Sequence, residues 1–489
     1  MASVNRREFL SLLAAGVGAA TAGALSRPSR AAADTRPPNV VLIFTDDQGY
    51  QDVGCFGSPK IKTPHLDRMA QQGMKFTSFY SAAPVCSASR AALLTGCYPA
   101  RVGITGVLFP NSNNGISDKE LTVAELLKGR GYATACIGKW HLGHLEPFLP
   151  TRHGFDRYYG IPYSNDMTID PQSARFADNC AFRDGQTAEQ ARTKGVKNLV
   201  PLMENEQIIE YPVDQSTLTR RYTEQAVKFI RENKDRPFFL YLPHTMPHIP
   251  LAVSEALKGK SARGLYGDVI EEIDWSVGQI LQVLDEVKLD RNTLVVFTSD
   301  NGPWLSMKAN GGCALPLRDG KFSTWEGGMR EPCIMRWTGT IPGGRVCDEV
   351  AGTIDVLPTL AGLAGAKLPD DRVIDGRDIS PLMTAKDGAV SPHEHYFYWR
   401  GGALEAVRSG KWKLHLGGQN KKAKDKDSKP LAPAGQLFDL QADIGEKTDL
   451  AARHPDVAER LAGAIRAARE EMRKNARPCG RADRPKGRK

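Results

Sequence analysis

The sequence predicts an α/β fold: a large central, mostly parallel sheet flanked by helices, followed by a smaller C-terminal domain of antiparallel sheet plus helix. Two patterns support this class. Through the first three quarters of the chain, short apolar segments alternate with segments of helical periodicity, as in strand–helix repeats. After residue 392 the pattern changes to aromatic-rich alternating segments, which are typical of antiparallel strands.

Four of the predicted strands share one feature, because each ends abruptly in polar residues. These strands lie within 38–50, 121–143, 237–251 and 292–302. Helices are predicted around them, one of them within 62–76. In open α/β sheets the carboxyl ends of the strands meet at one edge, where ligands bind. We therefore expect the polar residues after these four strands to share a site.

The chain is predicted to have four parts. Residues 1–33 form a signal peptide, 34–385 a large domain that contains the four polar strand ends, 386–470 a small C-terminal α+β domain and 471–489 a basic, disordered tail. The small domain is expected to contain aromatic-rich strands at 393–416, a charged, proline-containing loop at 421–435, one further strand, and a helix at 454–474.

The first 33 residues are predicted to be a bacterial export signal. Arg6 and Arg7 precede Phe9, an apolar and small-residue stretch follows, and Ala31–Ala33 offers a cleavage site. Paired arginines in this setting resemble a twin-arginine signal, with an ordinary secretory signal or a retained anchor as the alternative. No later stretch reaches the ~18 consecutive apolar residues of a membrane span. We expect a periplasmic or extracellular mature protein, without a transmembrane anchor, that uses the twin-arginine export machinery.

The net charge of +9 does not indicate a nucleic-acid partner. The first 33 residues hold four arginines against one glutamate, and residues 471–489 hold eight basic against two acidic residues, so the two ends carry the whole excess. We find no nucleic-acid-binding module. The nine cysteines form no CxxC pair, which argues against a zinc knuckle or a thioredoxin-type site.

Hard oxygen donors follow two of the predicted strands. Asp46 and Asp47 end one strand, and Asp300 and Asn301 end another. Taken alone, an Asp-Asp pair is most often a helix cap or a solvated turn. Three acids packed together, however, repel one another and need a cation. Oxygen ligands suit Ca²⁺, with Mg²⁺ as the second choice.

Cationic and titratable side chains follow the other strands. Lys139 and His141 lie in GKWHLG, His244 and His248 in PHTMPHIP, and Lys321 in a glycine-rich loop. Each alone is more often a solvated lysine or a core histidine. Together with a metal they predict a site for an anionic substrate. Cys86, in PVCSASRAALLTG, has four interpretations from the sequence alone: a buried thiol, a redox or metal thiolate, a nucleophile, or a precursor of another group.

These motifs resemble those of the sulfatase family, within the alkaline-phosphatase-like superfamily. The run from Cys86 to Arg90 is similar to its Cys-x-(Pro/Ala)-x-Arg signature, and GYATACIGKWHLG is similar to its second signature. GIPYSND and LRDGKFSTWEGG resemble the arylsulfatase A and N-acetylgalactosamine-6-sulfatase branch. The resemblance covers residues 38 to about 450. It implies a sulfuric ester hydrolase that cleaves sulfate monoesters.

The resemblance also implies that Cys86 is oxidised to formylglycine by a separate maturase. Hydration would give a gem-diol, whose first hydroxyl attacks sulfur and whose second loses a proton so that sulfate is expelled. Asp46, Asp47, Asp300 and Asn301 would hold Ca²⁺ beside the modified Cys86. Asp300 would accept the proton of the attacking hydroxyl.

The remaining roles follow from the same resemblance. Arg90 would stabilise the hydrated aldehyde, and Lys139 and Lys321 would bind the sulfate oxygens. Lys321 or His248 would protonate the leaving oxygen, and His141 would take the second diol proton.

Two residues have less certain places in this scheme. His248 is preferred over His244 for the leaving group because the family pattern places its histidine before an apolar-Pro step, and His244 would then lie behind the site or face the substrate. Ser164 would contact sulfate or substrate, with a structural role as the alternative.

Two other functions use the same residues. A formylglycine-dependent phosphonate or phosphodiester hydrolase shares the metal and the nucleophile. An inactive sulfoglycan-binding protein would follow if Cys86 were unmodified. The expected substrate is a sulfated carbohydrate, with aryl sulfates as reporters, since an exported enzyme meets sulfated polysaccharides first. Pocket loops diverge between relatives, so the sequence does not identify the sugar.

Overall fold

The computed structural model describes residues 36–168, 174–183, 185, 187–191, 200–417 and 435–483. The chain separates into residues 1–36 and residues 37–489, and the account below concerns the second unit. The predicted signal peptide, residues 1–33, lies outside the described residues. Among the helices of the described part of the chain, none is long and apolar enough to cross a membrane.

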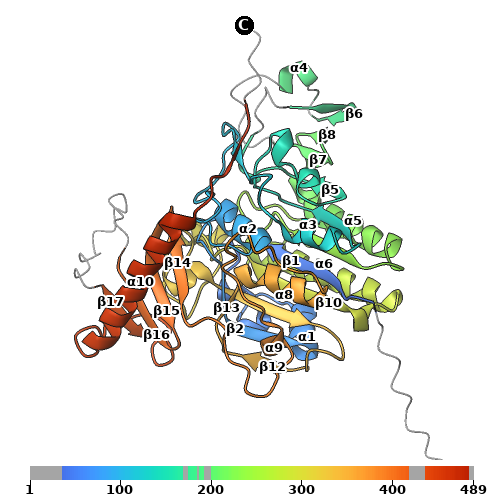
Figure 1. Ribbon diagram of the computed structural model, residues 1–489. Helices are drawn as coiled ribbons and strands as arrows, with labels where there is room; N and C mark the ends of the chain where they lie inside the picture. Colours follow the sequence, from blue (N-terminus) through green and yellow to red (C-terminus); the bar gives the residue numbers. More distant parts are fainter. Residues whose placement is uncertain are drawn as a thin grey trace, which may run out of the picture. The chain divides into compact units, whose positions relative to one another are not determined.

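A twelve-stranded mixed sheet forms the centre of residues 37–489 (Figure 1). Its order is β12 (Arg345–Cys347), β2 (Met74–Tyr80), β11 (Arg330–Arg336), β10 (Thr293–Ser299), β1 (Asn39–Thr45), β9 (Phe238–Pro243), β4 (Ala133–Ile137), β5 (Arg157–Gly160), β7 (Leu202–Glu204), β8 (Gln207–Tyr211) and β6 (Phe176–Phe182); β13 (Ala351–Gly352) also pairs with β2. The four strands predicted to end in polar residues are β10, β1, β9 and β4, which are parallel neighbours. The predicted fold class is confirmed.

Helices cover both faces of this sheet (Figure 1). One face packs against α1 (Pro64–Gln72), α5 (Leu218–Glu232) and α6 (Leu265–Glu286), and the other against α2 (Cys86–Thr95), α3 (Val123–Lys128) and α8 (Val356–Leu363). Alternate residues of β1 enter the two cores, Val41 and Ile43 on the first face and Leu42 and Phe44 on the second. Burial on both faces explains why the central strands are continuous apolar runs rather than alternating ones.

The C-terminal part forms a second, four-stranded antiparallel sheet. Its strands are β14 (Tyr396–Arg400), β15 (Ala403–Ser409), β16 (Trp412–His415) and β17 (Gln436–Asp439), and α10 (Pro455–Asn475) packs against it (Figure 1). Tyr396 and Tyr398 of β14 pack against Tyr80 of β2, so the small sheet shares a core with the end of the large one. The antiparallel sheet and its helix are confirmed, and the exact boundaries at 385 and 470 remain predictions.

The expectation of a disordered basic tail is wrong for most of its described part. Helix α10 continues to Asn475, and β18 (Gly480–Arg481) pairs with β3 (Asn114–Gly115). The Arg477 guanidinium lies 2.7 Å from the buried Glu120 carboxylate. Charge composition alone did not reveal these partners, because they lie more than 350 residues earlier in the chain. Residues 484–489 lie outside the described residues.

The sheet also has elements that the sequence did not predict. The strands β5, β7 and β8 are short, with three to five residues each, and carry charged residues such as Arg157 and Glu204. Short strands of mixed polarity have no clear period-two pattern. Three four-residue helices, α4 (Ala188–Ala191), α7 (Glu326–Met329) and α9 (Ser380–Met383), are likewise too short for a helical period.

We expect His153 to make stability depend on acid pH. This side chain is fully buried and stacks on Trp140, and its Nε2 donates to the Pro147 carbonyl over 3.1 Å. Burial lowers the pKa of His153 to about 4. An unfolded histidine protonates near pH 6.5, so its contribution is complete above that pH and is lost as pH falls toward 4, by roughly 3 kcal/mol.

The measurement compares urea unfolding of the wild type and His153→Gln between pH 7 and pH 4. We expect the free energy of unfolding to fall less steeply with acid in the variant. Equal slopes in the two proteins would contradict a buried neutral His153.

Candidate active site

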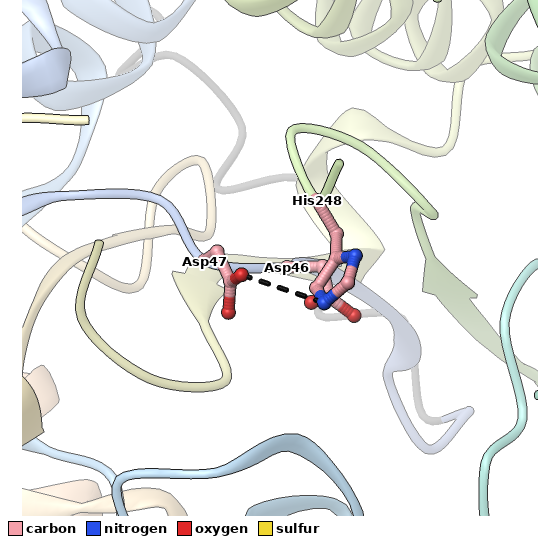
Figure 2. Close-up of side chains that lie close together, drawn as sticks. All are labelled: Asp46, Asp47 and His248. Atoms are coloured by element: carbon pink, nitrogen blue, oxygen red, sulfur yellow. Dashed lines mark ion pairs between the residues drawn. The ribbon is translucent and has the colours of Figure 1, made fainter. Parts of the chain in front are cut away.

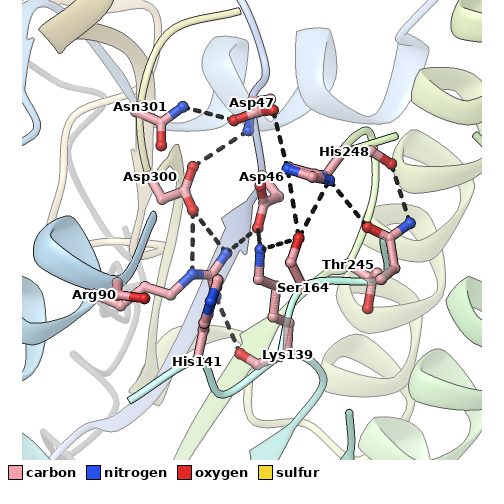
Figure 3. A network of polar contacts seen from close by, with 12 residues as sticks. Asp46, Asp47, Arg90, Lys139, His141, Ser164, Thr245, His248, Asp300 and Asn301 are labelled. Atoms are coloured by element: carbon pink, nitrogen blue, oxygen red, sulfur yellow. Dashed lines mark hydrogen bonds and ion pairs between the residues drawn. The ribbon is translucent and has the colours of Figure 1, made fainter. Parts of the chain in front are cut away.

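Four oxygen-bearing side chains meet where β1 and β10 end (Figure 3). Asp46 and Asp47 follow β1, Asp300 and Asn301 follow β10, and all four are at most 3% exposed. The Asp47 N–H donates to Asp300 Oδ1 over 3.2 Å, and Asn301 Nδ2 donates to Asp47 Oδ1 over 2.7 Å. Asp47 has a φ of 61°, a left-handed conformation that marks turns and functional sites. The structure therefore brings together the four residues predicted as metal ligands.

Arg90 joins the carboxylates of the two strands (Figure 3). Its Nε donates to Asp300 Oδ2 over 3.1 Å, and its terminal nitrogens donate to Asp46 Oδ2 over 2.7 Å and to the Lys139 carbonyl over 3.0 Å. The Arg90, Asp46 and Asp300 side chains are fully buried. A guanidinium suits this place because its fixed fork reaches two carboxylates at once. Arg90 thus sets the spacing between Asp46 and Asp300.

Lys139 enters the cluster from the turn after β4. Its Nζ lies 2.5 Å from Asp46 Oδ2 and donates to Ser164 Oγ over 3.2 Å. The turn depends on Gly138, which has a φ of 137° and where a Cβ would lie 1.9 Å from the Pro243 carbonyl oxygen. Only glycine tolerates that approach. Steric contact with Pro243 therefore explains why the residue before Lys139 in the motif is glycine.

Lys321 reaches the cluster from the loop between β10 and α7. Its Nζ lies 2.7 Å from Asp47 Oδ2, and the Lys321 side chain is 3% exposed. Near the end of this loop, the Trp325 ring stacks on the His415 ring of β16, with 3.8 Å between centroids and 9° between planes. The small C-terminal sheet therefore supports the loop that carries Lys321.

A buried charge cluster completes this support. Lys413 Nζ of β16 lies 2.9 Å from Glu326 Oε1 and 2.8 Å from Glu446 Oε1, with all three side chains buried. The same ammonium donates to the Thr324 carbonyl over 2.9 Å, and the Glu326 N–H donates to Glu446 Oε2 over 2.8 Å. One lysine of the small sheet therefore holds the end of the Lys321 loop and the start of α7.

The two carboxylates that Arg90 joins have pKa values shifted in opposite directions. Burial alone would raise the pKa of Asp46, but Lys139 and Arg90 outweigh it and hold that pKa well below its usual range. Burial and the Asp46 charge raise the pKa of Asp300 to about 7 against the opposing effect of Arg90. Burial and the neighbouring Asp46 charge therefore disfavour ionisation of Asp300, and a further cation would relieve this effect.

The two predicted catalytic histidines present one ring nitrogen each. His141 Nε2 donates to the Leu108 carbonyl over 2.9 Å, and its buried Nδ1 has no hydrogen-bond partner among the described residues. His248 Nδ1 donates to the Ile249 carbonyl over 2.6 Å, which leaves Nε2 3.6 Å from Asp47 Oδ2. Burial lowers the pKa of both rings, and the Lys139 charge adds to this effect at His141. Both neutral rings can therefore accept a proton.

Cys86 is the first residue of α2, four positions before Arg90, and is 2% exposed. Burial raises the pKa of the thiol, and the charges of Lys139 and Lys321 oppose this effect. A thiol with a raised pKa is a poor nucleophile and a poor metal ligand. Burial therefore favours the protonated thiol over the thiolate at this position.

The structure separates the two residues whose roles were uncertain. Ser164 Oγ lies 3.3 Å from His248 Nδ1 and accepts from Lys139, so it belongs to the cluster. His244 lies behind the strand end, where its Nε2 is 3.4 Å from Ser276 Oγ of α6. Among the described residues, no hydrogen bond or ion pair joins His244 to the carboxylates. A substrate contact for His244 is therefore not supported by its position.

Asn165 is a site residue that the sequence analysis missed. Its Nδ2 donates to the carbonyls of His248 and Pro250 over 3.2 and 3.0 Å, and its Oδ1 lies 3.1 Å from His248 Nδ1. It thus fixes the direction of the His248 ring. In the sequence, an asparagine after a serine in a short polar segment is typical of a turn. The only sequence signal for a role of Asn165 in the site was its position next to Ser164.

The oxygen atoms fit a hard divalent cation. Asp46 Oδ1 and Asn301 Oδ1 are buried and have no hydrogen-bond partner in the described part of the chain. Ligand atoms of Asp46, Asp47 and His248 lie within 4.8 Å of one another (Figure 2). Oxygen-rich sites of this kind select Ca²⁺ or Mg²⁺ over softer metals. The site can therefore bind a metal ion.

Fold and site together define a hydrolase of anionic esters with a carboxylate cluster that can bind a metal ion. Residues 38–366 match the family model described as sulfatase, and residues 391–487 match the model of the C-terminal region of aryl-sulfatase. The chain belongs to the sulfatase family and is a sulfuric ester hydrolase.

The comparisons with individual proteins agree with this assignment. Steryl-sulfatase of Mus musculus is 38% identical over 91% of this chain and 84% of its own length. N-acetylgalactosamine-6-sulfatase of Canis lupus familiaris is 41% identical over 85% and 76%, and arylsulfatase A of Homo sapiens is 40% identical over 85% and 83%. The solved structure of Ps i-CgsB in complex with k-i-k-neocarrahexaose has a TM-score of 0.75 and 30% identity, covering 91% of this chain and 95% of that chain.

Proposed function

We propose that this sulfatase removes sulfate from a sulfated carbohydrate, using bound Ca²⁺ and a formylglycine made from Cys86. The observation that carries the proposal is the buried cluster itself. Three carboxylates, Asp46, Asp47 and Asp300, face three cations, Arg90, Lys139 and Lys321, within hydrogen-bond distance. The fixed charges balance, so a divalent ion would leave a surplus of positive charge, which suits an anionic sulfate ester.

Ca²⁺ is held in this proposal by the oxygens of Asp46, Asp47, Asp300 and Asn301 beside residue 86. When bound, it supplies Lewis-acid polarisation and lowers the pKa of a nearby hydroxyl. The open oxygens Asp46 Oδ1 and Asn301 Oδ1 support this ligand set. Arg90 and Lys139 keep Asp46 ionised, so the chain holds at least one permanent negative ligand for the ion.

Formylglycine at residue 86, in its hydrated form, supplies the attacking hydroxyl. The chain's own residues then position the ester and move protons. Lys139 and Lys321 hold the sulfate oxygens, and Arg90 orients the group at residue 86, one helical turn away on α2. His141 would take the proton of the second diol hydroxyl at its open Nδ1, because its Nε2 already donates to Leu108, and loss of that proton would expel sulfate and restore the aldehyde. Asp300 accepts the proton of the attacking hydroxyl.

His248 is the proposed proton donor to the leaving oxygen, with Lys321 as the second candidate. The Nδ1 of His248 is committed to the Ile249 carbonyl, so Nε2 is the atom that carries the proton to the site. Burial lowers the pKa of this ring and the Asp47 carboxylate opposes that effect, so Nε2 has to take up a proton before it can pass one to the leaving oxygen. Burial alone would lower the pKa of Lys321, but the Asp47 carboxylate outweighs it and raises that pKa, so the ammonium is better suited to holding charge than to releasing a proton.

A sugar is the favoured leaving group. The dog relative is named for a sulfated amino sugar, and the solved neighbour holds a neocarrahexaose, whereas the mouse relative is named for a sterol. Aryl sulfates serve as reporters. A phosphonate or phosphodiester hydrolase remains the second candidate because it would use the same metal and nucleophile, and a sulfoglycan-binding protein would follow from unmodified Cys86.

The proposal also includes the cellular steps that the sequence suggests. A maturase modifies Cys86, the twin-arginine machinery exports the protein, and the mature enzyme acts in the periplasm or outside the cell. These steps rest on the residues 84–96 motif and on Arg6 and Arg7 of the predicted signal.

Production with and without a formylglycine-generating maturase tests the function. We expect mass spectrometry to find the Cys86 peptide as the aldehyde only in the first sample, and only that sample to release sulfate from 4-nitrophenyl sulfate and from at least one monosaccharide of a panel of galactose, N-acetylgalactosamine and glucosamine sulfates. Removal of Ca²⁺ with a chelator should stop the release, and added Ca²⁺ should restore it. Activity with an intact cysteine, or faster cleavage of a phosphodiester, would contradict the proposal.

A further inference from the structure

We propose that Trp304 and Phe322, called here the aromatic pair, form the wall of the active site that binds the ring of the sugar carrying the sulfate. The inference rests on the proposed function and adds a specificity-determining surface to it. Neither residue belongs to the charged cluster, and the sequence analysis gave neither a role, although Phe322 lies within the motif LRDGKFSTWEGG.

The aromatic pair is continuous with two residues of the active site. The Trp304 and Phe322 rings meet edge to face, with centroids 5.3 Å apart and planes at 85°. Lys321 Nζ lies 4.6 Å from the Trp304 centroid and 5.3 Å from the Phe322 centroid. The His248 and Trp304 ring centroids are 5.8 Å apart. A sulfate between Lys321 and His248 therefore has an aromatic surface directly beside it.

This surface is open, unlike the cluster next to it. Phe322 is 42% exposed, and Leu305, next to Trp304 in the chain, is 43% exposed, whereas Lys321 is buried. Large apolar side chains that stay in water next to a buried polar site mark a place where a ligand lies. Sugar rings offer apolar C–H faces, and aromatic side chains supply a flat apolar surface for them. The exposed ring face of Phe322 is therefore suited to a sugar.

The backbone of Phe322 adopts a strained conformation. Phe322 has a φ of 73°, a left-handed conformation in which glycine is the least strained residue and a bulky residue is an outlier. Its N–H donates to the Pro84 carbonyl over 3.0 Å, and the Lys321 N–H donates to the Pro303 carbonyl over 2.9 Å. The loop is thus tied both to the segment before Cys86 and to the residue before Trp304. Strain at an exposed phenylalanine points to function rather than to packing.

A purely structural role makes a different prediction. If the aromatic pair only shielded the Lys321 ammonium, its loss would reduce kcat/KM equally for every sulfate ester, because all substrates share the sulfate group. If the pair binds the sugar ring, only esters that carry a ring would be affected. A ring-free ester therefore separates the two roles.

The test uses matured enzyme and two substrates: the sulfated monosaccharide of the panel that the wild type cleaves fastest, and ethyl sulfate. In Phe322→Gly and Trp304→Ala we expect KM for the sugar sulfate to rise about 5- to 10-fold, as for the loss of one aromatic contact, with kcat within twofold. Ethyl sulfate turnover should stay within twofold. Glycine suits the left-handed backbone, so Phe322→Gly should fold, and Phe322→Tyr should keep the wild-type KM. Val346→Ala, a 54% exposed side chain on the edge strand β12, is the matched control and should change neither substrate.

Two results would overturn the inference while leaving the proposed function intact: an equal loss on both substrates, or no change in KM for the sugar sulfate in either variant. Matured wild-type enzyme that cleaves no sulfate ester would overturn the proposed function and this inference with it.

Discussion

Replacement of Asp300 by alanine is expected to lower kcat/KM for sulfate esters by about 10³-fold and to weaken Ca²⁺ binding. Asp300 accepts hydrogen bonds from Arg90 at one oxygen and from the Asp47 backbone at the other, so it connects the β1 and β10 ends. Its removal takes away one proposed ligand and one proton acceptor. It also leaves Arg90 with a single carboxylate partner, Asp46.

Turnover and calorimetric titration with Ca²⁺ measure the two effects of Asp300→Ala separately. Asp300→Asn keeps the shape and should restore folding stability but not activity, because the charge is still missing. Asp52→Asn is the matched control. Asp52 is equally buried and burial raises its pKa to about 7, but its partners are Tyr266 and backbone N–H groups outside the cluster. Near-normal activity of Asp300→Ala would remove this residue from the site.

Replacement of Lys413 by methionine is expected to lower the free energy of unfolding by about 3–5 kcal/mol, the usual cost of removing one partner of a buried ion pair. The variant leaves Glu326 and Glu446 facing each other in a buried site without their shared cation. Burial and Glu326 already raise the pKa of Glu446 to about 7 while Lys413 opposes that rise. We also expect kcat to fall, because the Lys321 loop loses its support at Thr324.

Urea unfolding and sulfate release measure the effects of Lys413→Met. The neighbouring Lys411 is a matched control: its Nζ lies 2.6 Å from Asp439 Oδ2, but the Lys411 side chain is 47% exposed. Lys411→Met should cost less than about 1 kcal/mol, as exposed pairs do. Adding Glu446→Gln to Lys413→Met should recover part of the lost stability. Similar unfolding of the two lysine variants would contradict the role given to burial.

The sequence predicted those parts of the fold that have a strong local pattern. β1, β4, β9 and β10 are apolar runs followed by polar residues, and the structure places all four side by side. The shared strand-end site followed from this pattern together with the general behaviour of parallel sheets. The short strands β5, β7 and β8 were missed, because their three to five residues give no measurable period.

The charged residues of the candidate site could be predicted from the sequence, but the residues that hold them in place could not. Asp46, Arg90, Lys139 and Asp300 lie in motifs or at strand ends, where polar residues are conspicuous. The partners that hold the site are ordinary in the sequence: Lys413 is one of many lysines in a charged region and lies 87 residues after Glu326. Such contacts come from tertiary structure alone.

The environment of helix α2 has a consequence for the order of events in the cell. All ten residues of α2 are buried, and Cys86 begins the helix two residues after Pro84, whose carbonyl accepts a hydrogen bond from the Phe322 N–H. A second protein could not reach a side chain that is 2% exposed without opening this part of the fold. Under the proposed function, the maturase must therefore act while residues 84–96 are still unfolded, during or just after synthesis. A molecule that folds before modification then stays inactive. The proportion of active enzyme therefore depends on the rate of modification relative to the rate of folding.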